Sequence, residues 1–211
     1  MSGAPVPMQL ADPGSVPARL RQLLLGWGCV GVVYFSTGLL EATAFTLPET
    51  ALDGQIAYHP GAVWLYLSFF VLIPYAYLAA PAARVRWLAR AMQLCALAAG
   101  IVFVFFPTTL AYPPAAGEGA GGWLLARLLE GDSSRNCLPS LHAGLTALCV
   151  WALQERTRPL RSGAALLLGM AICYSIIALR RHLAIDLAAG LLCGLASGAL
   201  AVKLTGPELY R

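Results

Sequence analysis

A histidine and an aspartate in the last third of the chain have the spacing of a catalytic pair. The stretch "RRHLAIDLAAG", residues 180–190, places His182 and Asp186 four residues apart, so on a helix they share one face. Asp186 lies within an apolar run, where an unpaired carboxylate is costly. A carboxylate that accepts a hydrogen bond from one imidazole nitrogen leaves the other nitrogen basic, as a nucleophile or general base must be. We therefore expect Asp186 to orient His182 as a nucleophile or a general base.

A second histidine stands at the head of another apolar run, in "NCLPSLHAGL", residues 136–145. Pro139 and Ser140 can open a helix, whose free backbone N–H groups and positive dipole end favour an anion. His142 follows two residues later. If this helix start lies beside His182, one pocket holds two imidazoles, a carboxylate and an anion-binding helix end. That combination predicts phosphoryl transfer.

The expected phosphate ligands are Ser140 and the arginines next to the two motifs, Arg135, Arg180 and Arg181. Guanidinium groups bind phosphate through paired hydrogen bonds. On a helix Arg180 and Arg181 would point about 100° apart, so we expect one at the phosphate and the other at the membrane interface.

Each motif taken alone also has a structural interpretation. The P-S-x-H stretch can be a turn followed by an interfacial histidine, and H-x3-D can close a helix end. The double arginine can be an interfacial anchor. For the third histidine, His59, a structural role is favoured over substrate contact.

Composition indicates which elements must position these residues. The 211 residues are 59% hydrophobic and 11% charged, with a mean hydropathy of +0.71, whereas soluble domains carry about 25% charged residues. Several apolar stretches approach the roughly 20 residues that cross a bilayer. The chain is therefore predicted to be a polytopic membrane protein, and its net charge of +4 bears on topology, not on nucleic-acid binding.

The predicted fold is an all-α integral membrane bundle of six transmembrane helices. A flexible tail, 1–18, precedes a six-span catalytic membrane domain, 19–204, and a short tail, 205–211, follows it. The fourth span is short, so we expect it to begin within a cavity walled by the other helices. In the loop before it, "WLLARLLEG" predicts a short interfacial helix. The six spans are 22–40, 61–80, 88–106, 140–153, 161–179 and 183–204.

Orientation follows from the basic residues, which favour the cytoplasmic side. A cytoplasmic N-terminus assigns most of the 14 Lys and Arg residues to that side. All three histidines then lie on the other side. We expect an integral protein of a bacterial inner (plasma) membrane, with both termini cytoplasmic and the active site facing the periplasm or exterior. The basic residues left on the active-site side are Arg127, Arg135, Arg180 and Arg181.

No metal or other cofactor is expected, because no metal-ligand spacing such as C-x2-C or H-E-x2-H occurs. Every cysteine except Cys137 lies in an apolar run, so no structural disulfide is expected either.

Taken together, "LPSLHAGL" and "SIIALRRHLAIDLAAG" resemble the type-2 phosphatidic acid phosphatase superfamily of six-span lipid phosphatases and phosphotransferases. The resemblance covers about residues 50–200. The second motif of that family is P-S-G-H. Pro139, Ser140 and His142 match it, with Leu141 in place of the glycine.

The third family motif is S-R-x5-H-x3-D. Ser175, His182 and Asp186 match it, while Ile176 replaces the arginine. The first motif, K-x6-R-P, is absent, and "FFPTTLAYPP" stands where it is expected. P-S-L-H and "HPGAVWLYLS" are more similar to the branch that contains inositolphosphorylceramide synthases and their bacterial relatives.

The resemblance implies roles for three residues. His182 would attack phosphorus and form a phosphohistidine, Asp186 would orient it, and His142 would protonate the leaving oxygen. The chain would then be a membrane lipid phosphatase that acts on a lipid phosphate or pyrophosphate. Two alternatives remain: a phosphotransferase that moves a phospho-headgroup between lipids, and an inactive lipid-binding relative.

Overall fold

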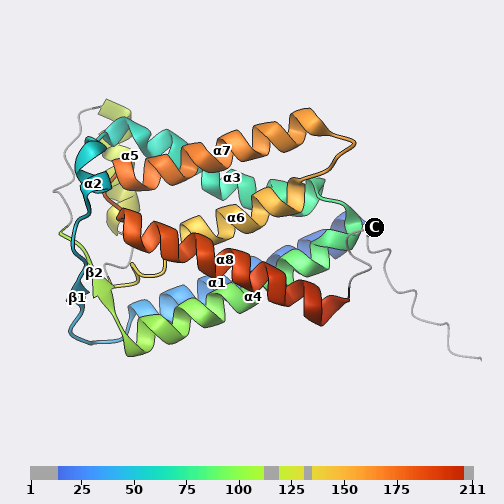
Figure 1. Ribbon diagram of the computed structural model, residues 1–211, viewed down its shortest axis with the longest axis horizontal. Coiled ribbons are helices and arrows are strands. Elements are labelled where there is room, and N and C mark those ends of the chain that lie inside the picture. Colours follow the sequence, from blue (N-terminus) through green and yellow to red (C-terminus); the bar gives the residue numbers. More distant parts are fainter. Residues whose placement is uncertain (1–13, 112–118, 131–134, 207–211) are drawn as a thin grey trace, which may run out of the picture.

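Six long helices form most of the chain and run side by side along its long axis (Figure 1). The computed structural model describes residues 14–111, 119–130 and 135–206, and most of the two predicted tails lies outside these ranges. The long helices are α1 (Val16–Gly38), α3 (Val63–Ala79), α4 (Ala82–Phe105), α6 (Leu141–Leu153), α7 (Pro159–Ala178) and α8 (Ala184–Thr205).

Each long helix corresponds to one predicted span. α1 and α4 begin at Val16 and Ala82, earlier than predicted. The predicted starts were too late because arginines near the beginning of each helix interrupt the apolar run. α6 is the shortest of these six helices, as expected, with 13 residues. Four described helical segments are long and apolar enough to cross a membrane, namely Pro60–Ala79, α4, α7 and α8. These segments indicate an integral membrane protein, while the count of six spans stays a prediction.

The short elements gather at one end of the bundle (Figure 1). They are the strands β1 (Phe45–Thr46) and β2 (Thr108–Thr109), the helices α2 (Ala51–Gln55) and α5 (Gly119–Glu130), and the 3-10 turn Pro60–Ala62. β1 and β2 pair in parallel, with Phe45 opposite Thr108. The sheet and α2 were not predicted from the sequence. α5 lies where the interfacial helix was expected, and its place at a membrane surface stays a prediction.

α6 packs closely against α8 because glycines remove side chains from the contact. A Cβ atom on Gly190 would lie 2.1 Å from the carbonyl oxygen of Ser140, and one on Gly194 would lie 2.4 Å from that of Gly144. Only glycine permits backbones to approach this closely. The contact brings the first turn of α6 to the first turn of α8, and these two turns carry the two histidine motifs.

Arginines close the helix ends at the opposite end of the bundle. Arg19 donates to the carbonyl oxygens of Tyr77 and Ala80 at 2.9 and 2.8 Å, and Arg161 donates to that of Ala79 at 2.7 Å. The last carbonyls of a helix lack partners within it, so cations there satisfy them and favour the negative dipole end. Both arginines belong to the set that the charge pattern assigns to the cytoplasmic side.

Candidate active site

His182 and Asp186 form a buried hydrogen-bonded pair where α8 begins. Asp186 Oδ2 lies 2.7 Å from His182 Nδ1, and Asp186 Oδ1 accepts a hydrogen bond from the Leu183 N–H at 2.6 Å. The carboxylate is fully buried and His182 is only 6% exposed. One carboxylate therefore caps the first turn of α8 and orients the imidazole. Because Nδ1 is occupied, Nε2 is the nitrogen of His182 that remains for reaction.

A left-handed turn between α7 and α8 presents His182. Arg180 has a φ of 53°. Its N–H donates to the carbonyl oxygen of Ile177, and the Arg181 N–H donates to that of Ile176. This is the hydrogen-bond pattern of a Schellman C-cap, whose left-handed position usually holds glycine. The expectation that Arg180 and Arg181 lie on a helix was therefore wrong, because α7 ends at Ala178 and α8 begins at Ala184. His182 lies in the same connection, so it does not share a helical face with Asp186, although their spacing predicted that it would.

The side chain of Arg180 ties this turn to α2. It donates to the backbone oxygens of Asp53 and Ile56 at 2.8 and 3.0 Å. A left-handed conformation costs an L residue roughly 1–2 kcal/mol, and two hydrogen bonds from a cation are enough to offset that cost. The structure thus uses Arg180 to hold the turn that carries His182.

Asp53 of α2 also fixes the position of the first turn of α8. Its Oδ1 accepts from the Ala184 N–H at 2.8 Å, and its Oδ2 accepts from the backbone N–H and the hydroxyl of Thr50, both at 2.7 Å. Burial raises the pKa of Asp53, but the hydrogen bonds from Thr50 and Ala184 and the charge of Arg180 outweigh it and lower the pKa. The stability that Asp53 contributes is present above the ordinary aspartate pKa and is lost as the pH falls through the lowered value.

Four contacts fix the start of α6. The Ser140 hydroxyl accepts from the Ala143 N–H at 3.3 Å, as an N-cap does, and the Ser140 N–H donates to the backbone oxygen of Asp186 at 3.0 Å. Just upstream, the Leu138 N–H donates to the Thr108 hydroxyl at 2.8 Å. The Asn136 side chain donates to the backbone oxygen of Tyr34 at 2.8 Å. The P-S-L-H stretch is therefore held against α8, β2 and α1.

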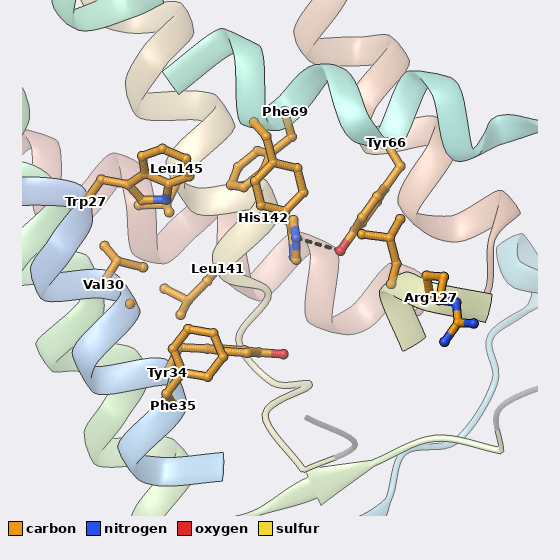
Figure 2. A pocket seen from close by; sticks show the side chains of 13 residues that line it. Trp27, Val30, Tyr34, Phe35, Tyr66, Phe69, Arg127, Leu141, His142 and Leu145 are labelled. Atoms are coloured by element: carbon orange, nitrogen blue, oxygen red, sulfur yellow. Dashed lines mark hydrogen bonds between the residues drawn. The ribbon is translucent and has the colours of Figure 1, made fainter. Parts of the chain in front are cut away.

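His142 lies beside His182 and contacts a tyrosine. The two imidazole rings are 5.8 Å apart between centroids. His142 Nε2 lies 2.8 Å from the Tyr66 hydroxyl, and its ring is 4.7 Å from that of Phe69 (Figure 2). The structure thus brings together His142, His182 and Asp186, which the sequence could join only as a hypothesis.

The other predicted residues occupy different places. Arg135 donates to the backbone oxygen of Leu40 at 3.0 Å, after the end of α1. Arg181 follows Arg180 in the turn and is partly buried. His59 is exposed, and its ring lies over Gly61. Within the residues that the structure describes, no group of three or more His, Cys, Asp or Glu side chains could hold a metal ion.

Three residues of the site were missed by the sequence analysis. Tyr66 on α3 touches His142, and Asp53 on α2 supports the first turn of α8. Arg127 on α5 lines the same cavity as His142 and pairs with Glu130 at 2.9 Å. A signal existed for Asp53, since Thr50 and Asp53 have the T-x-x-D spacing of a capping box. Arg127 was visible as one of the few basic residues on the predicted active-site side.

The geometry agrees with a comparison to protein families. A family model described as the PAP2 superfamily matches residues 46–200. The chain belongs to the PAP2 superfamily. The matched residues include both histidine motifs, Tyr66 and Asp53, whereas α1 precedes them. No curated protein and no solved structure matches the chain. Membership in the PAP2 superfamily suggests phosphatase or phosphotransferase activity.

Proposed function

We propose that this PAP2 protein cleaves a phosphoester or pyrophosphate of a lipid on the non-cytoplasmic face of the membrane, through a phosphohistidine at His182. The observation that carries the proposal is the buried pair of His182 and Asp186, joined at 2.7 Å, with His142 alongside. Capping the first turn of α8 needs only Asp186 Oδ1, whereas Oδ2 holds the imidazole of His182 beside His142, as a nucleophile requires.

The first step transfers the phosphoryl group to the enzyme. His182 Nε2 attacks phosphorus while Nδ1 keeps its proton and donates a hydrogen bond to Asp186. The bond between phosphorus and the leaving oxygen breaks, and His142 gives that oxygen a proton. In the second step water or an alcohol attacks phosphorus, His142 takes its proton, and the P–N bond to His182 breaks. The products are the lipid alcohol, or lipid monophosphate from a pyrophosphate, and either phosphate or a phosphorylated acceptor.

The membrane setting supports a lipid substrate. The site lies at the end of the bundle away from Arg19 and Arg161, which the charge pattern places in the cytoplasm. A substrate that reaches the site from the outer leaflet agrees with this arrangement.

The cation that binds phosphate must come from residues other than the missing first motif. Arg135 and Arg180 each bind backbone oxygens through their guanidinium groups. Arg181 is next to His182 in the chain and partly buried, and it is the phosphate ligand that we favour. We expect Arg181→Ala to lower kcat/KM. The loss should correspond to roughly 2–4 kcal/mol of transition-state stabilisation, the usual cost of removing a transition-state donor. Arg135→Ala and Arg180→Gly should have mild effects, since glycine keeps the left-handed turn. Equal mild losses in all three variants would place the phosphate cation elsewhere.

The proposal is tested by assaying the purified protein against lipid phosphates and pyrophosphates, with and without acceptor alcohols. Release of inorganic phosphate without acceptor identifies a phosphatase, and strict dependence on an acceptor identifies a phosphotransferase. Vanadate, which mimics the five-coordinate transition state, should inhibit either one. Turnover should survive a chelator because His182, His142 and arginine supply the nucleophile, the acid and the charge. No turnover in any condition, with no vanadate binding, would mean an inactive relative.

A further inference from the structure

The first helix contributes one wall of the cavity at the active site, although it precedes the residues matched by the PAP2 family model. The cavity has a volume of about 440 Å³ and includes His142 in its lining. Figure 2 shows the α1 side chains on one side of His142, with Tyr66 and Arg127 on the other. From α1 the lining residues are Trp27, Val30, Gly31, Tyr34 and Phe35.

The remaining walls are also mostly apolar. α3 supplies Tyr66, Phe69 and Phe70, and α6 supplies Leu141 and Leu145 beside His142. The aromatic rings of Phe69 and His142 are in contact, so the apolar lining reaches the imidazole itself. Apart from Arg127 of α5, which pairs with Glu130, these walls offer a polar headgroup few hydrogen-bond partners, whereas a hydrocarbon chain needs none.

The cavity is large enough for a hydrocarbon chain and is open at the surface of the helix bundle. An apolar cavity of about 150 Å³ holds one benzene molecule, so this one has room for roughly 15–20 carbon atoms. Phe35 and Phe70 line it and are 64% and 39% exposed, so the cavity is open at the surface of the bundle beside these two rings. A chain bound here could therefore continue into the bilayer between α1 and α3.

We infer that this cavity binds the hydrocarbon chain on the leaving-group side of the lipid substrate, and that α1 sets which chains fit. The inference rests on the proposed function, in which His142 protonates the leaving oxygen. The substituent on that oxygen must then extend from His142, and the space beside His142 is this cavity. The same placement holds whether the phosphoryl group passes to water or to an alcohol.

Two glycines of α1 allow a matched test. Gly31 lines the cavity, and a Cβ atom added to it would meet nothing within 4 Å. Gly31→Leu would fill the cavity from the α1 side without disturbing the backbone. Gly28 lies one turn earlier on α1, is exposed, is not part of the lining, and its Cβ atom would also meet nothing within 4 Å. Gly28→Leu is therefore the control, with the same gain in helix propensity.

The experiment compares dodecyl phosphate with butyl phosphate as substrates of the full chain in one detergent. Gly31→Leu should lower kcat/KM for dodecyl phosphate about tenfold or more and lower it much less for butyl phosphate. Gly28→Leu should leave both substrates unchanged. A second measurement uses the rise in Tm caused by dodecylphosphonate, which binds but is not cleaved. Gly31→Leu should reduce that rise, and Gly28→Leu should not.

The two measurements separate failure of the inference from failure of the proposed function. If dodecylphosphonate does not raise Tm, or raises it equally in both variants, the chain does not bind in this cavity. Equal losses for dodecyl and butyl phosphate in Gly31→Leu would also overturn the inference. If the wild type turns over neither substrate but only Gly31→Leu weakens phosphonate binding, the subsite stands and the proposed chemistry fails.

Discussion

Replacement of His182 by alanine is expected to lower kcat by at least about a thousandfold, because the proposed mechanism forms its covalent intermediate on His182. The loss should be catalytic and not structural. Asp186 would keep its hydrogen bond from the Leu183 N–H, and the turn held by Arg180 and Asp53 would keep its contacts. Asp186 Oδ2 loses its partner, so thermal stability in detergent should fall modestly, far less than activity does.

A matched control and a chemical signature accompany this variant. His59→Ala replaces an exposed histidine at the same end of the bundle and should retain normal turnover. Rapid acid-free quenching of the wild type with radiolabelled lipid phosphate should trap label on the protein, stable to base and labile to acid. His182→Ala should trap none. Near-normal turnover by His182→Ala would rule out the phosphohistidine mechanism.

Asp186→Asn extends the same test. An amide can still accept from the Leu183 N–H, so the first turn of α8 should persist. It cannot stabilise the positive charge that develops on His182 during attack, and it can hold the wrong tautomer. A loss nearly as large as that of His182→Ala is expected.

The two histidine motifs could be found in the sequence because each is local. His182 and Asp186 are four residues apart and form a hydrogen bond, although His182 lies two residues before α8 and not on a helical face shared with Asp186. Their approach to His142 depends on contact between α6 and α8. The sequence contains a pattern that predicts a close helix contact. Gly190, Gly194 and Gly198 recur every four residues, the spacing of small side chains at close helix contacts in membranes.

Other parts of the site depend on long-range packing that a single sequence does not display. Tyr66 reaches His142 because of how α3 is rotated against α6, and nothing in the apolar run of α3 distinguishes it from Tyr75. Arg180 was read as a phosphate ligand on a helix, whereas a left-handed turn, normally marked by glycine, directs it to α2. A five-residue helix such as α2 is too short to show a hydrophobic period.

His142→Gln should reveal its role through the leaving group. General acid catalysis contributes roughly 10²–10⁴-fold when the leaving oxygen is a poor leaving group that needs a proton. A loss of that size is expected with an alkyl phosphate, whose alkoxide is unstable. With 4-nitrophenyl phosphate the leaving group departs as a stable anion, so the same variant should lose little.

Tyr66→Phe should also slow turnover of the alkyl phosphate, but by less than His142→Gln does. The hydroxyl lies 2.8 Å from His142 Nε2, while the rings of Tyr66 and Phe69 both pack against the imidazole. Phenylalanine keeps the packing and removes the hydrogen bond that orients the ring, so kcat for the alkyl phosphate should fall while KM stays nearly constant. Tyr75→Phe, a change of the same kind at a 46% exposed position of α3, should have no effect.

If His142→Gln slows alkyl and nitrophenyl phosphates equally, His142 is not the general acid. If only His142→Gln shows the leaving-group difference, Tyr66 does not position it.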